Sequence, residues 1–294
     1  MIAWLPTGTV NRNSKGNDMS LPALDHAVID VRDRLDEATA QYRALGFHLT
    51  DRGYHTLGSA NHLAIFRTNY LELLAMGLPG GRIRQELMPF PEGMNGMVFA
   101  THDSDADYRA IAARGVAMRA PASFSRPVTL TDGVHDARFR TTHVQTGEVP
   151  FGRLYFCQHY TPELVWRAEW QEHPNGATDV VRMLIASNDV NATAALFTRM
   201  FGARPEQKPD GTLRVLADTV ALDIVTTDQA AVALGEAFPD PAGRACFIAL
   251  LGLRTSSLQR TREALAAVSP LNADADRLIV PARAACNVAL EFTS

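Results

Sequence analysis

One order of segments occurs four times along this chain of 294 residues, and it constrains the fold more than any other feature. Each unit begins with an apolar stretch typical of a buried strand, continues through an amphipathic helix and ends in further strand-like segments. The units begin near residues 26, 96, 181 and 246. We therefore predict an α+β protein of four βαβββ modules, with two curved, mostly antiparallel sheets and helices on their outer sides.

The first unit shows the pattern most clearly. Residues 25–31 form a largely apolar strand segment, and the apolar residues of segment 35–45 recur at three- and four-residue intervals, as on one face of a helix. Asp33 is a candidate N-cap for this helix, and Gly46 is a candidate for its end. Asp103 stands at the matching position of the second unit. The same cap-and-glycine arrangement thus predicts helix boundaries in successive modules.

Two modules in each half give a two-part organisation. We expect residues 21–165 to form an N-terminal barrel and residues 180–294 to form a C-terminal barrel. Segment 166–179 is rich in polar and aromatic residues and is expected to link them. Residues 1–20 are expected to be a leader that is disordered or foreign to the native protein, with Met19 as the working start.

Composition narrows the functional classes. The net charge of −4 and pI of about 6.1 do not favour nucleic-acid binding, which requires a basic face. No apolar run approaches the roughly 18–20 residues that cross a bilayer. All three cysteines lie in apolar stretches and lack zinc-site spacing, so we expect buried thiols and a cytoplasmic protein. Motifs of nucleotide-binding loops and of serine hydrolases are absent.

Several motifs resemble a known family. LDHAVIDV, a helix that ends in LGF, ANHLAIF and YLELLAM follow one another between residues 24 and 76. Together they resemble the opening module of glyoxalase-like proteins of the vicinal oxygen chelate superfamily, which includes glyoxalases, bleomycin resistance proteins and extradiol dioxygenases. FCQHYTPELVWRAEWQEHPNGA, residues 156–177, resembles a signature of its four-module branch. The resemblance implies paired modules folded into half-open sheets around a metal-centred cavity.

The resemblance also implies metal ligands on the first and last strands of a module. By position these are His26 and Glu72, and Glu72 is also the expected catalytic residue, as a ligand or as a proton shuttle. Nitrogen and oxygen donors suit zinc, iron, manganese, nickel or cobalt. In the alternative interpretation, His26 is a hydrogen-bonded structural residue and Glu72 is paired at a sheet edge. A carboxylate buried alone in YLELLAM would be costly, so Glu72 needs a partner in either case.

The second module departs from the family pattern. Gly96 or a neighbour stands where the first module has His26. On the last strand, His159 is the candidate third ligand and Gln158 is the alternative, because alternation along a strand lets only one of them face inward. With His159, the set would be two histidines and a carboxylate, which leaves coordination positions open for substrate.

Other residues are candidates for substrate binding. His55 and His62 lie on expected middle strands, although His62 could equally serve packing. Tyr160, Trp166 and Arg167 follow His159, and aromatic rings beside an arginine suit an anionic or planar ligand. They could instead pack as a linker across the barrel mouth. Three further histidines lie near polar stretches and are expected to be solvated: His102, His135 and His143.

Two classes of function remain open at this stage. The first is a metal-dependent enzyme, a lyase, isomerase or dioxygenase, that acts on a small oxygen-chelating substrate. The second is a metal-free protein that binds or sequesters a small molecule, as bleomycin resistance proteins do. The incomplete ligand set of the second module favours the latter. Exposed edge strands make a homodimer possible, and neither a nucleic acid nor a membrane is an expected partner.

Overall fold

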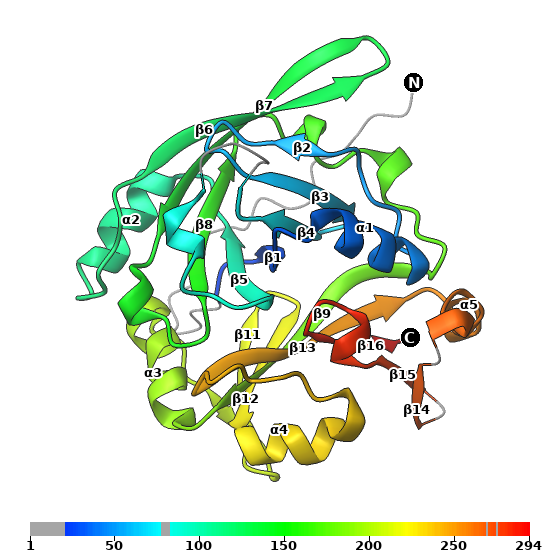
Figure 1. The fold of residues 1–294 in the computed structure, drawn as a ribbon. Coiled ribbons are helices and arrows are strands. Elements are labelled where there is room, and N and C mark those ends of the chain that lie inside the picture. Colours follow the sequence, from blue (N-terminus) through cyan, green and yellow to red (C-terminus); the bar gives the residue numbers. More distant parts are fainter. Residues whose placement is uncertain (1–20, 78–82, 269, 275) are drawn as a thin grey trace, which may run out of the picture.

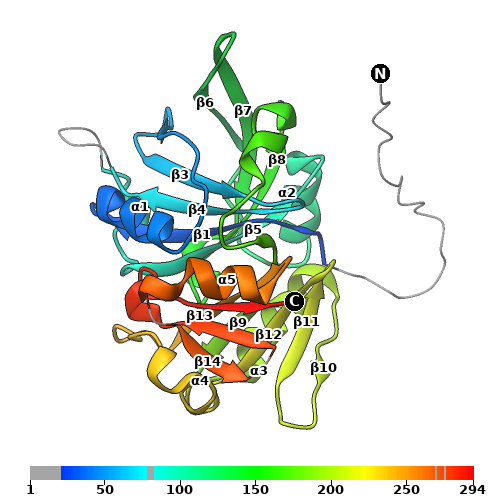
Figure 2. The same cartoon turned by 90° about the vertical axis from the view of Figure 1, so that its right-hand side faces the viewer.

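The computed structural model describes residues 21–77, 83–268, 270–274 and 276–294, and the expected leader 1–20 lies outside these ranges. Two eight-stranded sheets lie one above the other, as Figure 1 and Figure 2 show. The strand order is β2-β3-β4-β1-β5-β8-β7-β6 in the first sheet and β10-β11-β12-β9-β13-β16-β15-β14 in the second. The predicted fold of four βαβββ modules in two curved sheets is confirmed.

Each half has the same succession of strands and module helices, and the second half adds helix α4 between its two modules. The first half contains β1 (Leu24–Arg32), α1 (Leu35–Ala44), β2 (Gly53–Tyr54), β3 (Ala60–Ile65), β4 (Tyr70–Ala75), β5 (Gly93–Ala100), α2 (Ser104–Ala112), β6 (Ala122–Leu130), β7 (Gly133–His143) and β8 (Arg153–His159). The second half contains β9 (Ala177–Ser187), α3 (Val190–Phe201), β10 (Glu206–Gln207), β11 (Leu213–Ala217), β12 (Val220–Thr226), α4 (Thr227–Leu234), β13 (Cys246–Thr255), α5 (Leu258–Ala264), β14 (Leu271–Asp274), β15 (Arg277–Val280) and β16 (Ala289–Thr293).

Strand pairing repeats in every module. The first strand of a module runs parallel to its last strand, as in β1/β4, β5/β8, β9/β12 and β13/β16. The two modules of a half then join through an antiparallel pair, β1/β5 or β9/β13. Strand β9 begins at Ala177, so the end of the segment that was expected to be a linker, 166–179, belongs to a strand.

The helix ends follow local capping, with one exception. The side chain of Asp103 accepts a hydrogen bond from the backbone of Ala106 and caps α2 as predicted. The predicted cap of α1 is wrong, because Arg34 occupies the N-cap position and Asp33 precedes it. The chain turns just before the helix, where Arg32 has φ 58° and the Arg34 amide donates to the Val31 carbonyl over 2.9 Å. That turn places Asp33 one residue too early to cap.

The two sheets share one core. Alternate side chains of each strand, such as Ile29 of β1 and Ile185 of β9, belong to a single apolar cluster that spans both halves and includes helix residues. The rings of Phe47 and Phe292 lie 6.2 Å apart within it. Side chains on the other face of β1, such as Val28, belong to a separate cluster on the concave side of the first sheet.

The concave side of the second sheet is filled. Helix α4 packs there through Ala230 and Leu234, against Leu184 and Phe247 of the sheet. Nearby, Arg182 and Arg214 both bind the buried carboxylate of Asp223, and Arg182 also binds Glu291. The two halves therefore share a topology, but in the second half apolar packing and ion pairs occupy the face that is hollow in the first.

The three cysteines, Cys157, Cys246 and Cys286, are free and buried. None of the helices within the described ranges is both long and apolar enough to cross a membrane.

Candidate active site

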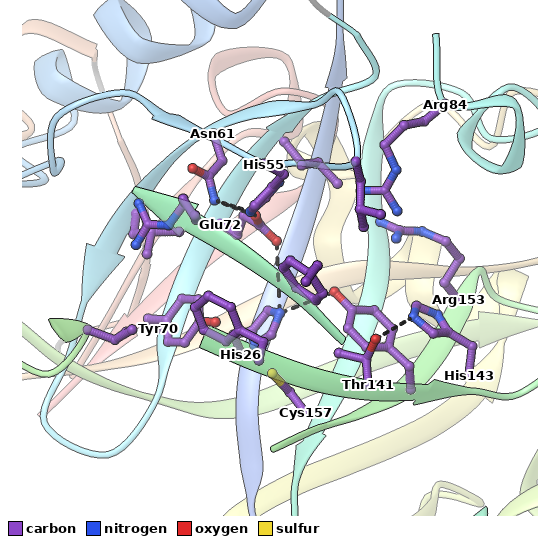
Figure 3. A pocket seen from close by; sticks show the side chains of 18 residues that line it. His26, His55, Asn61, Tyr70, Glu72, Arg84, Thr141, His143, Arg153 and Cys157 are labelled. Atoms are coloured by element: carbon purple, nitrogen blue, oxygen red, sulfur yellow. Dashed lines mark hydrogen bonds and ion pairs between the residues drawn. The ribbon is translucent and has the colours of Figure 1, made fainter. Parts of the chain in front are cut away.

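A cavity lies on the concave face of the first sheet, and Figure 3 shows the side chains that line it. His26 reaches it from β1, and Glu72 from β4. The parallel register pairs His26 with Tyr70 and Val28 with Glu72, so alternate residues of two neighbouring strands face the same space. The structure thus brings His26 and Glu72 into one cavity.

Glu72 is only 5% exposed and has three polar neighbours. Its Oε1 accepts a hydrogen bond of 2.6 Å from Asn61 Nδ2 and lies 3.8 Å from His55 Nε2, while its Oε2 lies 3.8 Å from His26 Nε2. Burial alone would raise the pKa of Glu72, but the two imidazoles and the Asn61 amide outweigh it and lower that pKa. The carboxyl group is therefore ionised at neutral pH.

His26 is held from behind by an acid. Its Nδ1 lies 2.5 Å from Asp25 Oδ1, its Nε2 lies 3.2 Å from the Tyr155 hydroxyl, and its ring stacks on Tyr70 with centroids 4.4 Å apart. A carboxylate on Nδ1 fixes the ring orientation and directs the Nε2 lone pair into the cavity. Neighbouring residues of a strand normally point to opposite faces, but a register shift at Leu24/His26 in the β1/β5 pairing brings Asp25 beside His26.

Tyr155 occupies the place in the second module that Glu72 has in the first. The register pairs Val98 with Tyr155 as it pairs Val28 with Glu72, and it pairs Gly96 with Arg153 as it pairs His26 with Tyr70. Burial raises the pKa of Tyr155 well above its usual value, so its hydroxyl keeps its proton. The second module therefore contributes a neutral donor instead of a second carboxylate.

Two further histidines line the cavity. Burial lowers the pKa of His55 to about 4, and burial together with the nearby Arg153 lowers the pKa of His143 to about 3. The expectation that His143 is solvated is wrong, because β7 is covered by β6 and β8 on its two edges and the His143 ring stacks on Tyr155 at 4.3 Å. Both imidazoles are neutral at pH 7.

His159 faces inward at a different point from Glu72. Its Nε2 lies 3.1 Å from Asp25 Oδ2 and 3.5 Å from Cys157 Sγ. It follows Tyr155 and Cys157 on the same face of β8, but it is four residues beyond Tyr155 and so meets Asp25. Gln158 points the other way and donates to the His102 carbonyl over 2.6 Å.

Asp25, Cys157 and His159 form a second polar group beside the cavity. One potential ligand atom from each lies within 4.8 Å of the others, and no other such trio occurs in the part of the chain that the structure describes. His159 Nδ1 is buried without a hydrogen-bond partner. This trio can hold a soft or borderline cation, with sulfur, nitrogen and oxygen donors.

Comparison with known proteins places this architecture. The family model of the glyoxalase-like domain matches residues 24–201, more than half of the chain. The chain belongs to the glyoxalase-like domain family. Its fold, with paired modules around a concave face, is that of the vicinal oxygen chelate superfamily. A search of curated protein sequences finds no match.

Solved structures share this fold at low sequence identity. A hypothetical protein from Staphylococcus aureus has a TM-score of 0.66 and 14% identity, and the match covers 92% of this chain and 99% of that one. A triple mutant of 4-hydroxymandelate synthase from Streptomyces coelicolor has a TM-score of 0.60 and 10% identity, covering 93% and 92%. A xylose isomerase-like TIM barrel/4-hydroxyphenylpyruvate dioxygenase fusion protein has a TM-score of 0.55 and 12% identity, and the match covers 86% of this chain and 40% of the fusion protein.

Four expected substrate-binding residues of this glyoxalase-like protein do not line the cavity. His62 alternates with Asn61 on β3 and so faces the opposite side, where it bonds the Thr50 carbonyl over 2.7 Å. Tyr160 is 48% exposed. The remaining two lie after β8, where the Trp166 ring packs at a tilt against the His159 ring, with centroids 4.8 Å apart, and Arg167 pairs with Glu169.

The sequence analysis missed three arginines that line the cavity: Arg84, Arg126 and Arg153. Arg126 and Arg153 lie on β6 and β8 and are 4% and 7% exposed. Register is the signal that could have found Arg153, because it stands opposite Gly96 on the neighbouring strand. Arg84 follows the undescribed segment 78–82, and its sequence context gives no such signal.

Proposed function

We propose that this glyoxalase-like protein is an enzyme that moves a proton at a carbon next to a carbonyl group of a small substrate, as isomerases and lyases do. The observation that carries the proposal is the Glu72 carboxylate, ionised although buried, beside the protonated hydroxyl of Tyr155 and the oriented ring of His26. A proton acceptor, a hydroxyl donor that can bind a carbonyl oxygen and an imidazole nitrogen that can bind a metal thus converge on one cavity.

In the proposed reaction, Glu72 Oε2 accepts the proton from the substrate carbon. The electron pair of the broken C–H bond moves to the carbonyl oxygen, and the Tyr155 hydroxyl donates a hydrogen bond to the negative charge that develops there. Return of the proton to the neighbouring carbon completes an isomerisation, and loss of a leaving group from that carbon completes an elimination. Asn61 holds the carboxylate in place through Oε1.

The family implies a divalent metal, and two side chains fit one. His26 Nε2 and Glu72 Oε2 are 3.8 Å apart, which two coordination bonds of about 2.0–2.2 Å can span. A cation held there would supply positive charge for the oxygens of the substrate, and Glu72 would accept the proton only when it does not serve as a ligand. Because the protein offers two donors and Tyr155 stays protonated, substrate oxygens would have to supply further ligands. The metal would then bind more tightly when the substrate is present, and the substrate would bind more tightly when the metal is present.

The proton-transfer proposal is tested by hydrogen exchange. Hydroxyacetone and pyruvate each carry oxygens on neighbouring carbons and an exchangeable C–H, so deuterium incorporation from D₂O can be followed by NMR. We expect wild type to accelerate exchange of at least one compound and Glu72→Gln to slow it by about 100-fold or more. Glu163→Gln, at an exposed position, is the control. Equal exchange by wild type and Glu72→Gln would contradict the proposal, as would no exchange by the wild type.

Metal analysis separates the two donor groups. Protein purified without a metal-affinity tag is expected to lose its divalent ion in His26→Ala and in Glu72→Gln, but to keep it in Cys157→Ser. Loss in Cys157→Ser alone would assign the ion to Asp25, Cys157 and His159 instead. Ligand binding without metal or hydrogen exchange would favour the alternative function, a small-molecule binding protein.

A further inference from the structure

Arg153 is a buried cation with free hydrogen-bond donors. No hydrogen bond or ion pair joins its side chain to another residue of the described ranges, and its Nε and Nη2 are buried and unpaired. These two atoms lie on the same edge of the guanidinium plane, the edge that forms two parallel N–H···O bonds with a carboxylate. The guanidinium lies 5.8 Å from the centroid of the Tyr155 ring, but this contact leaves both N–H groups without an acceptor, which is costly for a buried cation, so an acceptor from outside the chain is expected.

The space around this edge is open because a glycine, which has no side chain, stands opposite Arg153. Gly96 stands opposite Arg153, and a Cβ there would lie 2.7 Å from Val28 Cβ and 3.5 Å from Arg153 Nη2. In the first module the matching pair is His26 and Tyr70. The second module thus presents a guanidinium at the level where the first presents an imidazole.

Arg84 reaches the same end of the cavity, as Figure 3 shows, on the far side of Glu72 from Tyr70. Its Nε is 2.7 Å from Glu86 and its Nη1 donates to Ser59 over 3.1 Å, so Glu86 offsets its charge. Acidic side chains near enough to be affected by the charge of Arg153 do not bind it. Its charge helps to lower the pKa of Glu72 and only opposes the larger effect of burial at Asp30, whose pKa is raised, yet neither acid forms an ion pair with it.

We infer that Arg153 binds a carboxylate of the substrate and holds the rest of the molecule toward Glu72 and His26. The walls between these ends include the rings of Phe124, Phe139 and Tyr155, which suit an apolar body. The substrate class is therefore a small organic acid. The inference rests on the proposed function for the site of the reaction, but anion binding can be measured separately from the reaction.

Calorimetric titration with benzoate and benzamide tests the inference, because the two differ in charge and little in shape. Wild type is expected to bind benzoate at least tenfold more tightly than benzamide. Arg153→Gln should weaken benzoate binding by about 10- to 100-fold, the range for hydrogen bonds to a charged group, and leave benzamide unchanged. Arg153→Lys keeps the charge but loses the paired donors, so it should recover part of the preference and serves if Arg153→Gln does not fold.

The controls separate this inference from the proposed reaction. Arg138→Gln, at an exposed position on β7, should bind benzoate as wild type does. Glu72→Gln should bind it at least as tightly as wild type even though exchange activity is lost. Inorganic phosphate is the second anion, and tighter binding of phosphate than of benzoate would overturn the assignment to a carboxylate. Equal binding of benzoate and benzamide, no binding of either, or an Arg153→Gln variant that keeps the preference would overturn the inference.

Discussion

Asp30 is a buried acid that works against the stability of the fold. It lies on β1, its Oδ1 accepts the Arg32 backbone amide over 2.9 Å, and its Oδ2 has no partner. Burial is the largest influence and raises the pKa of Asp30 from 3.8 to about 6, against the opposing effect of the Arg32 amide and of nearby arginines. The folded protein therefore holds this proton more tightly than the unfolded chain does, and ionisation above the folded pKa destabilises the fold.

Asp30→Asn should accordingly stabilise the protein. Asparagine keeps the acceptor for the Arg32 amide and removes the charge. At pH 8 we expect the free energy of unfolding to rise by about 2–3 kcal/mol, since each pKa unit corresponds to about 1.4 kcal/mol. The gain should shrink as the pH falls and become small near about pH 3, below the unfolded pKa of 3.8, where the carboxyl is mostly protonated in both states. Urea unfolding at the two pH values measures it, and a gain independent of pH would refute this account.

Asp25 acts through His26. Because it binds Nδ1 and not the cavity-facing Nε2, Asp25→Asn should leave the cavity lined as before but lose the charge that orients the ring. We expect exchange activity to fall by about 10- to 100-fold, the usual range for a residue behind a ligand or base. The pH profile of exchange should also shift relative to wild type. Exchange at the wild-type rate with an unshifted profile would show that the contact is structural only.

At the scale of single elements, caps make a clean comparison. Asp189 caps α3 by accepting the Ala192 amide over 2.9 Å, whereas Asp33 caps nothing. Asp189→Ala should therefore lower the free energy of unfolding by about 1 kcal/mol, and Asp33→Ala should leave it within a few tenths. Denaturant unfolding of both variants checks this. Equal losses would mean that α1 uses Asp33 in solution.

The elements themselves could be predicted from sequence because each module repeats one pattern. Helix α3 ends before Gly202, which has φ 75°, just as α1 ends before Gly46 with φ 77°. Apolar periodicity and glycine position are local signals, so they survive without an alignment. The predicted cap of α1 was wrong because the start of the helix depends on the left-handed backbone conformation of Arg32, and the local sequence does not indicate that conformation.

The site was predictable only where the family resemblance assigns it to strand positions. His26 and Glu72 occupy the first and last strands of one module, and periodicity of two sends both inward. Asp25 needed a register shift to join them, and Tyr155 needed the pairing of β5 with β8. Both are long-range features of the sheet, and a single sequence carries no direct signal for either.

At the scale of the whole molecule, the buried histidines make the free energy of unfolding depend on pH. Burial lowers the pKa of His143 to about 3 and the pKa values of His55 and His173 to about 4, from 6.5 in each case. Between these values the unfolded chain binds protons that the folded protein does not, so stability is lost as the pH falls below 6.5. Asp30 acts in the opposite direction between 3.8 and about 6.

The balance of these groups is measurable. Between pH 6 and 5, three histidines against one carboxyl leave a net difference of about two protons, so the free energy of unfolding should fall by about 2.5 kcal/mol per pH unit. Asp30→Asn should make this slope about one and a half times as steep. Chemical unfolding of both proteins at about pH 5.0, 5.5 and 6.0 would measure both slopes. Identical slopes in the two proteins would contradict the assignment.

The unequal modules of the first sheet have a stereochemical consequence. If both modules were alike, the cavity would present a carboxylate from each side and would bind a molecule equally well in two orientations. Instead Glu72 stands on one side, Tyr155 takes the matching place, and Arg153 faces the far end. A substrate tethered by its carboxylate then exposes a single prochiral face to the base. The product of such an enzyme should be one enantiomer, and its handedness would follow from the broken symmetry of the fold.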